Sequence, residues 1–324
     1  MTWFERSQPL LIIFSVLLGL GLSLIGDVAT LSGHLITPLL MGMLYAAFLP
    51  ILLRHLGGAF RNYRVTISSL AINFVWTPLL AWGLGVLFLR DAPDLRVGLL
   101  MLMVTPCTDW YLLFTGIAKG NVSLATALLP LNFILQMVLL PVYLALFAQA
   151  EVSLDFGVLV SKIAIVLLIP MGLALLSRYA IGRLKGPTWL HQKLPQVAMV
   201  QLLCLNLAIV AIFAAEGATV LQQPDLVLRL LLPIGLFFII NFLLSQLVGR
   251  AIKLAYSEVA CLTCTTLARN SPVALAVAAA AFGDRPLIAL TLVIGPLIEL
   301  PIMALVAQVL LRSRSDYSKP SRLE

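Results

Sequence analysis

The chain is organised as a series of long apolar stretches separated by short polar segments that hold most of the basic residues. A stretch of about 20 apolar residues is the length that an α-helix needs to cross the hydrocarbon core of a bilayer. The strands of a membrane β-barrel are about 10 residues long and alternate between polar and apolar positions, which does not fit these runs. We therefore predict an all-α polytopic membrane protein with ten transmembrane helices. They lie near residues 9–28, 34–53, 66–89, 97–117, 121–148, 156–177, 196–215, 226–248, 255–282 and 286–311.

Composition supports a membrane protein and narrows its function. Of the 324 residues, 61 % are hydrophobic and 11 % are charged, whereas a soluble domain carries about 25 % charged residues. The sequence has no Walker loop, no dinucleotide-binding glycine motif and no nucleophile–base arrangement, and its histidines lack metal-ligand spacing. These observations argue against an ATP-driven pump and against a membrane enzyme, and they predict neither a cofactor nor a bound metal.

The net charge of +7 is interpreted as a topology signal, because Lys and Arg gather on the cytoplasmic side of membrane proteins. We do not interpret it as a nucleic-acid site. When both termini are placed in the cytoplasm, most basic residues fall inside. Four remain outside, namely Arg90, Arg96, Arg229 and Arg285. The bias predicts a multi-pass protein of the cell inner membrane with an even number of spans.

The two halves of the chain, residues 1–150 and 155–312, resemble each other weakly. Each half contains five predicted spans, so the second half enters the membrane from the opposite side, as in the inverted repeats of many secondary transporters. Gly120 and Gly283 each precede a long span. Gln136 and Glu299 follow these glycines at the same offset, since 136 − 120 and 299 − 283 both equal 16.

Two spans are predicted to be interrupted at corresponding places in the two halves. The fourth contains TPCTD at residues 105–109, and the ninth contains RNSP at residues 269–272. Proline removes a backbone donor and disfavours helix in the residue before it, while Thr108 and Asp109 are suited to capping a second half-helix. Paired broken helices indicate a transport site near the middle of the bilayer.

Three ionisable side chains, Asp109, Arg269 and Glu299, fall in the middle of predicted spans, where each costs at least about 2.5–3.5 kcal/mol. They either take part in transport or form an internal ion pair, such as Asp109 with Arg269, that holds helices together. Buried pairs stabilise poorly compared with apolar replacements, so we favour transport. Amides within spans offer ligands for an ion, or else hydrogen bonds between helices; they are Asn73, Asn132 and Gln136.

Four motifs of the sequence are informative together. They are Cys107 thirteen residues before Gly120-Asn121; Asn132, Gln136 and Val142-Tyr143; Asn270 ahead of Phe282-Gly283; and Gly295-Pro296-Leu297-Ile298-Glu299-Leu300-Pro301. With these motifs the sequence resembles the bile/arsenite/riboflavin transporter superfamily over nearly its whole length, and within it the arsenite-efflux permease branch. The motif in the tenth span is the most specific of the four.

The resemblance implies a core of helices 3–5 and 8–10, in which the discontinuous helices 4 and 9 cross, and a panel of helices 1, 2, 6 and 7 that moves against it. In this sequence the panel would be residues 1–60 and 155–215, the core residues 61–150 and 222–312, and the cytoplasmic tail residues 313–324. The resemblance also implies that Cys107 is a thiol facing a metalloid and that Glu299 couples transport to protons. A thiolate is a soft ligand, which suits As(III).

The sequence departs from that branch at three positions. Pro272 stands where the branch has a glutamate, and Asp109 stands where it has a small apolar residue. Arg269 would suit an anion better than neutral arsenous acid. We predict that the substrate site comprises Cys107, Thr108, Asp109, Arg269, Asn270 and Ser271. We predict that the ion-coupling site comprises Asn73, Asp109, Asn132, Gln136 and Glu299.

The sequence thus predicts a secondary active transporter that extrudes arsenite or antimonite by alternating access in exchange for protons. The alternative is a sodium-coupled symporter of an organic anion, in which amides and freed carbonyls hold Na⁺ and Arg269 attracts the substrate. A receptor or scaffold without transport is a third reading, and the sequence has no sensor or docking domain to support it. The predicted partners are a small-molecule or metalloid substrate, H⁺ or Na⁺, and the lipid bilayer. No oligomeric state is predicted.

Overall fold

The computed structural model describes residues 8–50, 59, 62–107, 110–148, 156–222 and 224–317. Within these ranges the regular elements are helices, apart from one isolated bridge between Pro106 and Arg269. Among the described residues, seven helices are long and apolar enough to cross a membrane. Large apolar side chains are exposed along them, including Leu87 at 71 %, Leu146 at 70 % and Leu176 at 67 %. Because soluble proteins rarely expose apolar surface on this scale, the chain is a multi-pass membrane protein.

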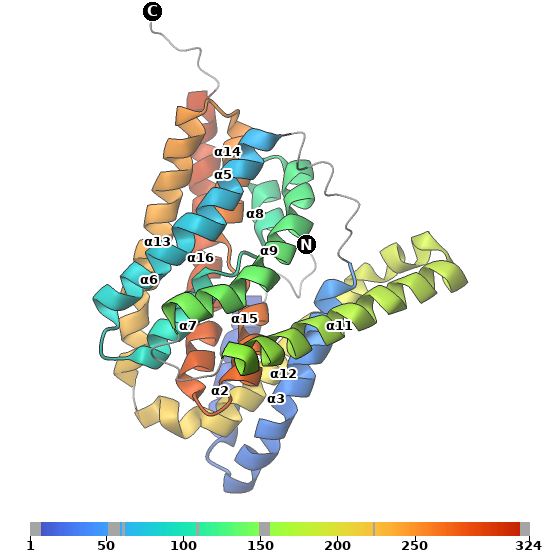
Figure 1. Ribbon diagram of the computed structural model, residues 1–324, viewed down its shortest axis with the longest axis vertical. Coiled ribbons are helices and arrows are strands. Elements are labelled where there is room, and N and C mark those ends of the chain that lie inside the picture. The colour runs from blue at the N-terminus through green and yellow to red at the C-terminus, as the bar shows by residue number, and fades with distance from the viewer. Residues whose placement is uncertain are drawn as a thin grey trace, which may run out of the picture. The chain divides into compact units, whose positions relative to one another are not determined.

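The chain forms two compact units. The first contains the described residues of Met1–Ile51, Leu144–Leu228 and Ser271–Leu297. Its helices pack with α12 along α2 and α3, and with α11 against α3, α12 and α15 (Figure 1). Their bounds are α2 Gln8–Leu22, α3 Gly26–Phe48, α11 Phe156–Lys185, α12 Pro187–Gln222 and α15 Ser271–Ala281.

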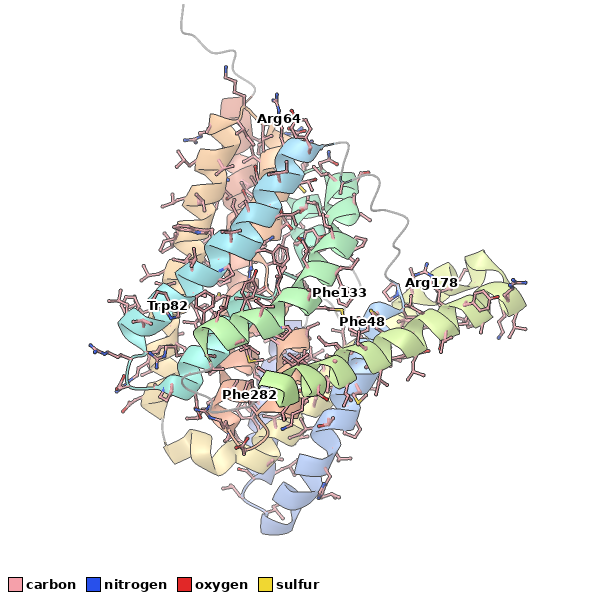
Figure 2. All side chains as sticks on the ribbon, in the orientation of Figure 1. Phe48, Arg64, Trp82, Phe133, Arg178 and Phe282 are labelled. Carbon is pink, nitrogen blue, oxygen red and sulfur yellow. The ribbon has the colours of Figure 1, made fainter. Side chains whose placement is uncertain are left out.

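Small residues let α2 and α12 approach each other closely. A Cβ atom added to Gly19 would lie 2.6 Å from the Cβ of Phe213, and one added to Gly217 would lie 2.6 Å from the Oγ of Ser23. Such contacts are typical of membrane helices, whose association depends on close packing. Nearer the end of α3, Arg178 on α11 donates from Nη1 to the carbonyl of Leu49 at 3.3 Å, next to the labelled Phe48 (Figure 2).

The second unit contains the described residues of Leu52–Tyr143, Arg229–Asn270 and Ile298–Glu324. Within it α14 packs against α5 and α8, and α6 packs against α7. Arg64 lies at the start of α5 and Trp82 lies on α6 (Figure 2). The division between the units runs through three long helices, α9 Val122–Phe147, α13 Pro224–Ala251 and α16 Pro286–Tyr317. The other elements are α5 Tyr63–Ala71, the π-helical turn η2 Ile72–Trp76, α6 Thr77–Phe88, α7 Pro93–Met103, α8 Trp110–Ile117 and α14 Tyr256–Leu267.

The loop between α8 and α9 lies against α14 because Gly120 has no side chain. A Cβ atom at Gly120 would lie 2.8 Å from Cγ2 of Thr115 and 3.0 Å from Cβ of Ala260. The next residue, Asn121, donates its backbone N–H to the carbonyl of Ser257 at 2.8 Å. Its side-chain oxygen accepts from the N–H of Leu124 at 3.0 Å and so caps α9. The Gly-Asn pair noted in the sequence therefore joins α9 to α14.

Several predicted helix boundaries are wrong. The first span was expected over 9–28, but α2 ends at Leu22 and α3 already begins at Gly26, because Ser23 to Ile25 form a turn of i→i−3 and i→i−4 backbone bonds. The basic segment that was expected to be a loop between spans six and seven is helical on both sides of Gly186. The φ of +81° at Gly186 permits the chain to turn sharply from α11 into α12. The spans expected over 156–177 and 196–215 are parts of α11 and α12.

Both predicted interruptions are confirmed. α7 ends at Met103 and α8 begins at Trp110, while α14 ends at Leu267 and α15 begins at Ser271. The ten-span count, the inverted repeat and the division into panel and core stay predictions. Of the remaining helices, α2 has 15 residues, fewer than the 18 residues required of the seven spanning candidates.

Candidate functional site

The two interruptions lie against each other in the second unit. Pro106 and Arg269 form an antiparallel bridge. The N–H of Cys107 donates to the carbonyl of Ala268 at 3.0 Å, and the N–H of Asn270 donates to the carbonyl of Thr105 at 2.6 Å. Backbone groups outside a helix must find partners when water is excluded. Here the two breaks supply partners to each other.

The helix ends beside this bridge leave carbonyls without intrahelical donors, and side chains supply them. The hydroxyl of Thr105 donates to the carbonyls of Met101 at 3.0 Å and Leu102 at 3.2 Å, at the end of α7. The amide Nδ2 of Asn73 donates to the carbonyl of Thr265 at 3.2 Å, in the last turn of α14. The site is therefore built on the C-terminal ends of two helices, where the helix dipoles place partial negative charge.

Arg269 fills the space between these ends and is only 2 % exposed. Its Nε donates to the carbonyl of Leu267 at 3.1 Å, and its Nη1 donates to the carbonyl of Met103 at 2.7 Å. Its Nη2 donates to Oδ1 of Asn73 at 3.0 Å and also to the carbonyl of Thr266. The guanidinium thus holds four oxygen atoms, three of which are backbone carbonyls at helix ends.

Glu299 on α16 is the second charged group of the site. It is 3 % exposed, and among the described residues it and Arg269 are the charged side chains that are buried. Its Oε1 accepts from the backbone N–H of Arg269 at 2.8 Å. The carboxylate therefore binds the backbone of the break in α14–α15, while the guanidinium binds the carbonyls.

Asn73 owes its position to a π-helical turn. Within η2 the N–H of Thr77 donates to the carbonyl of Ile72, one residue further back than in an α-helix. Pro78 has no N–H for the carbonyl of Phe74, its i−4 partner. The hydroxyl of Tyr143 donates to that carbonyl instead, at 2.6 Å. Such π-helical turns are frequent at functional sites.

Asn132 and Gln136 are one turn apart on α9, so they share a helix face. Both are fully buried. Asn132 donates from Nδ2 to the hydroxyl of Thr265 at 3.1 Å, which places it next to the carbonyl bound by Asn73. Its Oδ1, and both amide atoms of Gln136, have no hydrogen-bond partner among the described residues. These amide atoms are buried in an apolar interior without hydrogen bonds, which costs free energy of folding.

Cys107 lies in the bridge itself and is 5 % exposed. Its Sγ accepts from the N–H of Trp110 at 3.3 Å, the first residue of α8. The thiol therefore stands at the N-terminal end of a half-helix, where the helix dipole favours an acceptor.

The structure thus places five of the predicted residues at one junction, and Asn132 joins them through Thr265. Gln136 lies on the same face of α9 as Asn132, and its amide makes no hydrogen bond with the described residues. The predicted residues Thr108 and Asp109, and with them the proposed Asp109–Arg269 ion pair, lie outside the described residues. Ser271 begins α15 and belongs to the first unit. The five residues at the junction are Asn73, Cys107, Arg269, Asn270 and Glu299.

Three residues were given no role in the sequence analysis although they hold the site together, namely Thr105, Tyr143 and Thr265. A signal existed for Tyr143, because Pro78 shows that the carbonyl of Phe74 needs another donor. No comparable signal marked Thr265, whose hydroxyl and carbonyl are each bound by one of the amides.

Two broken helices that meet at a junction with a buried arginine and a buried glutamate are the arrangement typical of a membrane transporter. The sequence matches the Sodium Bile acid symporter family over residues 37–223, which is more than half of the chain, so the protein belongs to that family.

Two relatives carry the name arsenical-resistance protein Acr3. The one from Corynebacterium glutamicum is 29 % identical over 247 residues, which cover 72 % of this chain and 66 % of the relative. The one from Alkaliphilus metalliredigens is 23 % identical over 295 residues, which cover 86 % and 82 %. The uncharacterized transporter slr0944 of Synechocystis is 25 % identical over 214 residues, which cover 65 % and 56 %. The chain thus spans less than two thirds of the first of these relatives and of slr0944.

Proposed function

We propose that this protein is a secondary active transporter that extrudes arsenite or antimonite from the cytoplasm in exchange for protons. The observation that carries the proposal is the position of Cys107, whose backbone N–H binds the break in the other helix while its thiol lies at the start of α8. Two relatives named for arsenical resistance support the same substrate. A soft sulfur ligand selects a thiophilic metalloid over the hard ions of the cell.

The chemistry assigns a role to each group. The thiol of Cys107 exchanges with one hydroxyl of arsenous acid, so that an As–S bond forms, water leaves, and arsenic stays trivalent. Asn132 and Gln136, which carry unpartnered amide atoms, belong with Asn73 and Asp109 to the ion-coupling site around Glu299. Glu299 takes up and releases the coupling proton, and Thr108, Asp109 and Ser271 complete the substrate site.

Alternating access follows if the predicted panel, residues 1–60 and 155–215, rocks against the predicted core. In this proposal the protein lies in the cytoplasmic membrane with both termini inside. Reporter fusions at the two ends, read for cytoplasmic or external location, test that orientation.

The first test is the arsenite sensitivity of an efflux-deficient bacterial strain that expresses the wild type or Cys107→Ser. We expect the wild type to protect the strain and Cys107→Ser to lose protection at equal membrane abundance. Cys204→Ser is the matched control, because Cys204 is a half-buried thiol on α12 in the first unit. The proposal of thiol-dependent metalloid efflux is refuted if well-expressed wild type does not protect the strain. It is also refuted if Cys107→Ser and Cys204→Ser lose protection equally.

A second candidate is the sodium-coupled symport of an organic anion, which is favoured by the family itself. In this mechanism the amides and freed carbonyls hold Na⁺, and Cys107 has no chemical role. Uptake of an organic anion that requires Na⁺ and survives Cys107→Ala distinguishes this candidate from metalloid efflux.

A further inference from the structure

The oxygen atoms around Arg269 form a cluster suited to a cation. The carbonyls of Thr266 and Leu267 belong to the end of α14, and the carbonyl of Met103 belongs to the end of α7. The side-chain oxygen of Asn73 joins them from η2. Hard monovalent cations bind such groups of carbonyl and amide oxygens, and unwound carbonyls at half-helix ends hold the coupling ions of secondary transporters.

In this protein the cluster is already occupied. The guanidinium of Arg269 places three of its nitrogen atoms on the four oxygens. The ring of Phe237 covers its face, with the Cζ atom 5.2 Å from the ring centroid. Among the described residues no carboxylate lies at ion-pair distance from the guanidinium. Its charge is therefore balanced by the oxygens and by two helix ends, as that of a bound metal cation would be, together with the buried Glu299 on the backbone N–H of the same residue.

In the part of the chain that the structure describes, the hydrogen bonds to these four oxygens come from Arg269. The carbonyls of Thr266, Leu267 and Met103 lie in last helical turns, where intrahelical donors are missing. Neighbouring carbonyls in the same turns are bound by Thr105 and Asn73. Removing the guanidinium would leave three buried carbonyls and one amide oxygen facing a space of arginine size, which is the arrangement of a cation site.

We propose that Arg269 is a covalently tethered cation that occupies an internal monovalent-cation site and makes this site independent of Na⁺. Because Arg269 occupies the oxygen cluster, Na⁺ does not bind there during transport. Transport is then coupled to an ion gradient through Glu299. The inference deepens the proposed function, on which it rests only for the role of Glu299. The occupancy of the cluster is tested without any substrate.

The experiment measures the apparent melting temperature of purified protein in detergent, in NaCl, KCl or choline chloride at equal ionic strength, and in added methylguanidinium. Wild type is expected to melt at the same temperature in all three salts. Arg269→Ala is expected to be less stable in choline and to be restored saturably by Na⁺, K⁺ or methylguanidinium, by about 3–6 °C at about 150 mM.

Two further variants serve as controls. Arg269→Lys keeps a tethered charge and is expected to be insensitive to Na⁺ although it cannot reach all four oxygens. Arg229→Ala removes an exposed arginine from the same unit and is expected to respond as wild type does.

Two results would overturn the proposal. One is a folded Arg269→Ala variant that no cation stabilises. The other is that Na⁺ stabilises wild type saturably and that Asn73→Ala abolishes this stabilisation. This measurement tests whether the cluster binds Na⁺ even if Arg269→Ala does not fold. If wild type gives no arsenite protection but these cation responses appear, the substrate assignment fails and the tethered cation stands.

Discussion

The role of Glu299 is tested by comparing two substitutions that both remove its charge. Glu299→Gln keeps an oxygen that accepts from the backbone N–H of Arg269, a bond of 2.8 Å between buried groups. Glu299→Ala leaves that N–H without a partner, which costs about 1–3 kcal/mol. Because the loss of charge is common to both, we expect Glu299→Ala to melt a few degrees, roughly 2–10 °C, below Glu299→Gln.

Transport gives the second measurement. A carrier that exchanges one proton per substrate sustains up to about a tenfold accumulation for each pH unit, since a tenfold ratio corresponds to about 1.4 kcal/mol. In everted membrane vesicles with an acidified lumen, the logarithm of the arsenite accumulation ratio of wild type should rise in proportion to the imposed pH difference. Glu299→Gln should equilibrate it to a ratio of about one, because its amide cannot exchange a proton.

The two measurements refute different parts of the reasoning. Accumulation by Glu299→Gln with an unchanged dependence on the pH difference would show that another group carries the proton. Equal stability of the Gln and Ala variants would show that the hydrogen bond to Arg269 does not hold the break in place. A well-folded Glu299→Gln that retains downhill arsenite flux but not accumulation is the expected result.

Three further predictions concern the second unit. Gly120→Ala should lower the melting temperature by the equivalent of about 1–3 kcal/mol, because its Cβ atom would lie 2.8 Å from Thr115; an unchanged melting temperature would contradict the close approach. Lys119→Gly should raise the free energy of unfolding by about 1 kcal/mol, because Lys119 has a φ of +54° at the end of α8. A lower melting temperature of this variant would be inconsistent with that backbone conformation. The hydrogen bond from Arg229 holds the pKa of the exposed Asp91 below its ordinary value of 3.8. The pair of Asp91 and Arg229 therefore stabilises the fold above pH 3.8, and this stabilisation is lost as the pH falls through the lowered pKa of Asp91. Asp91→Asn should therefore change the melting temperature only slightly at neutral pH, and less at high salt; a large, salt-independent shift would show a role beyond this pair.

The sequence predicts the two breaks well because proline acts locally. Pro106 and Pro272 each remove a backbone donor; α7 ends at Met103, shortly before Pro106, and α14 ends at Leu267, shortly before Pro272. It predicts the buried charges equally well, since Arg269 and Glu299 stand in long apolar runs that leave them no route to water.

The partners of these charges were not predictable in the same way. The pair of Arg269 with Asp109 stays a prediction, and the acceptors of Arg269 among the described residues are largely backbone carbonyls, which the sequence analysis did not consider. A carbonyl has no sequence signature, so its availability depends on where another helix ends. The boundaries of the first helices failed for a related reason, because a turn made by backbone bonds alone leaves little trace in an apolar sequence.

Three prolines show how far local reasoning extends in this protein. A proline at position n leaves the carbonyl at n−4 without its helical donor, so Pro78, Pro106 and Pro272 mark the carbonyls of Phe74, Leu102 and Ala268. In the structure these accept from the hydroxyl of Tyr143, the hydroxyl of Thr105 and the N–H of Cys107. The vacant acceptor can thus be identified from one chain position, whereas its donor is local for Leu102 and distant for the other two. For Ala268 the donor is the backbone of the residue whose thiol we assign to the substrate. This hydrogen bond links the proposed substrate site directly to the backbone that Arg269 and Glu299 hold in place. Movement of Cys107 relative to the break in α14–α15 would therefore strain or break it.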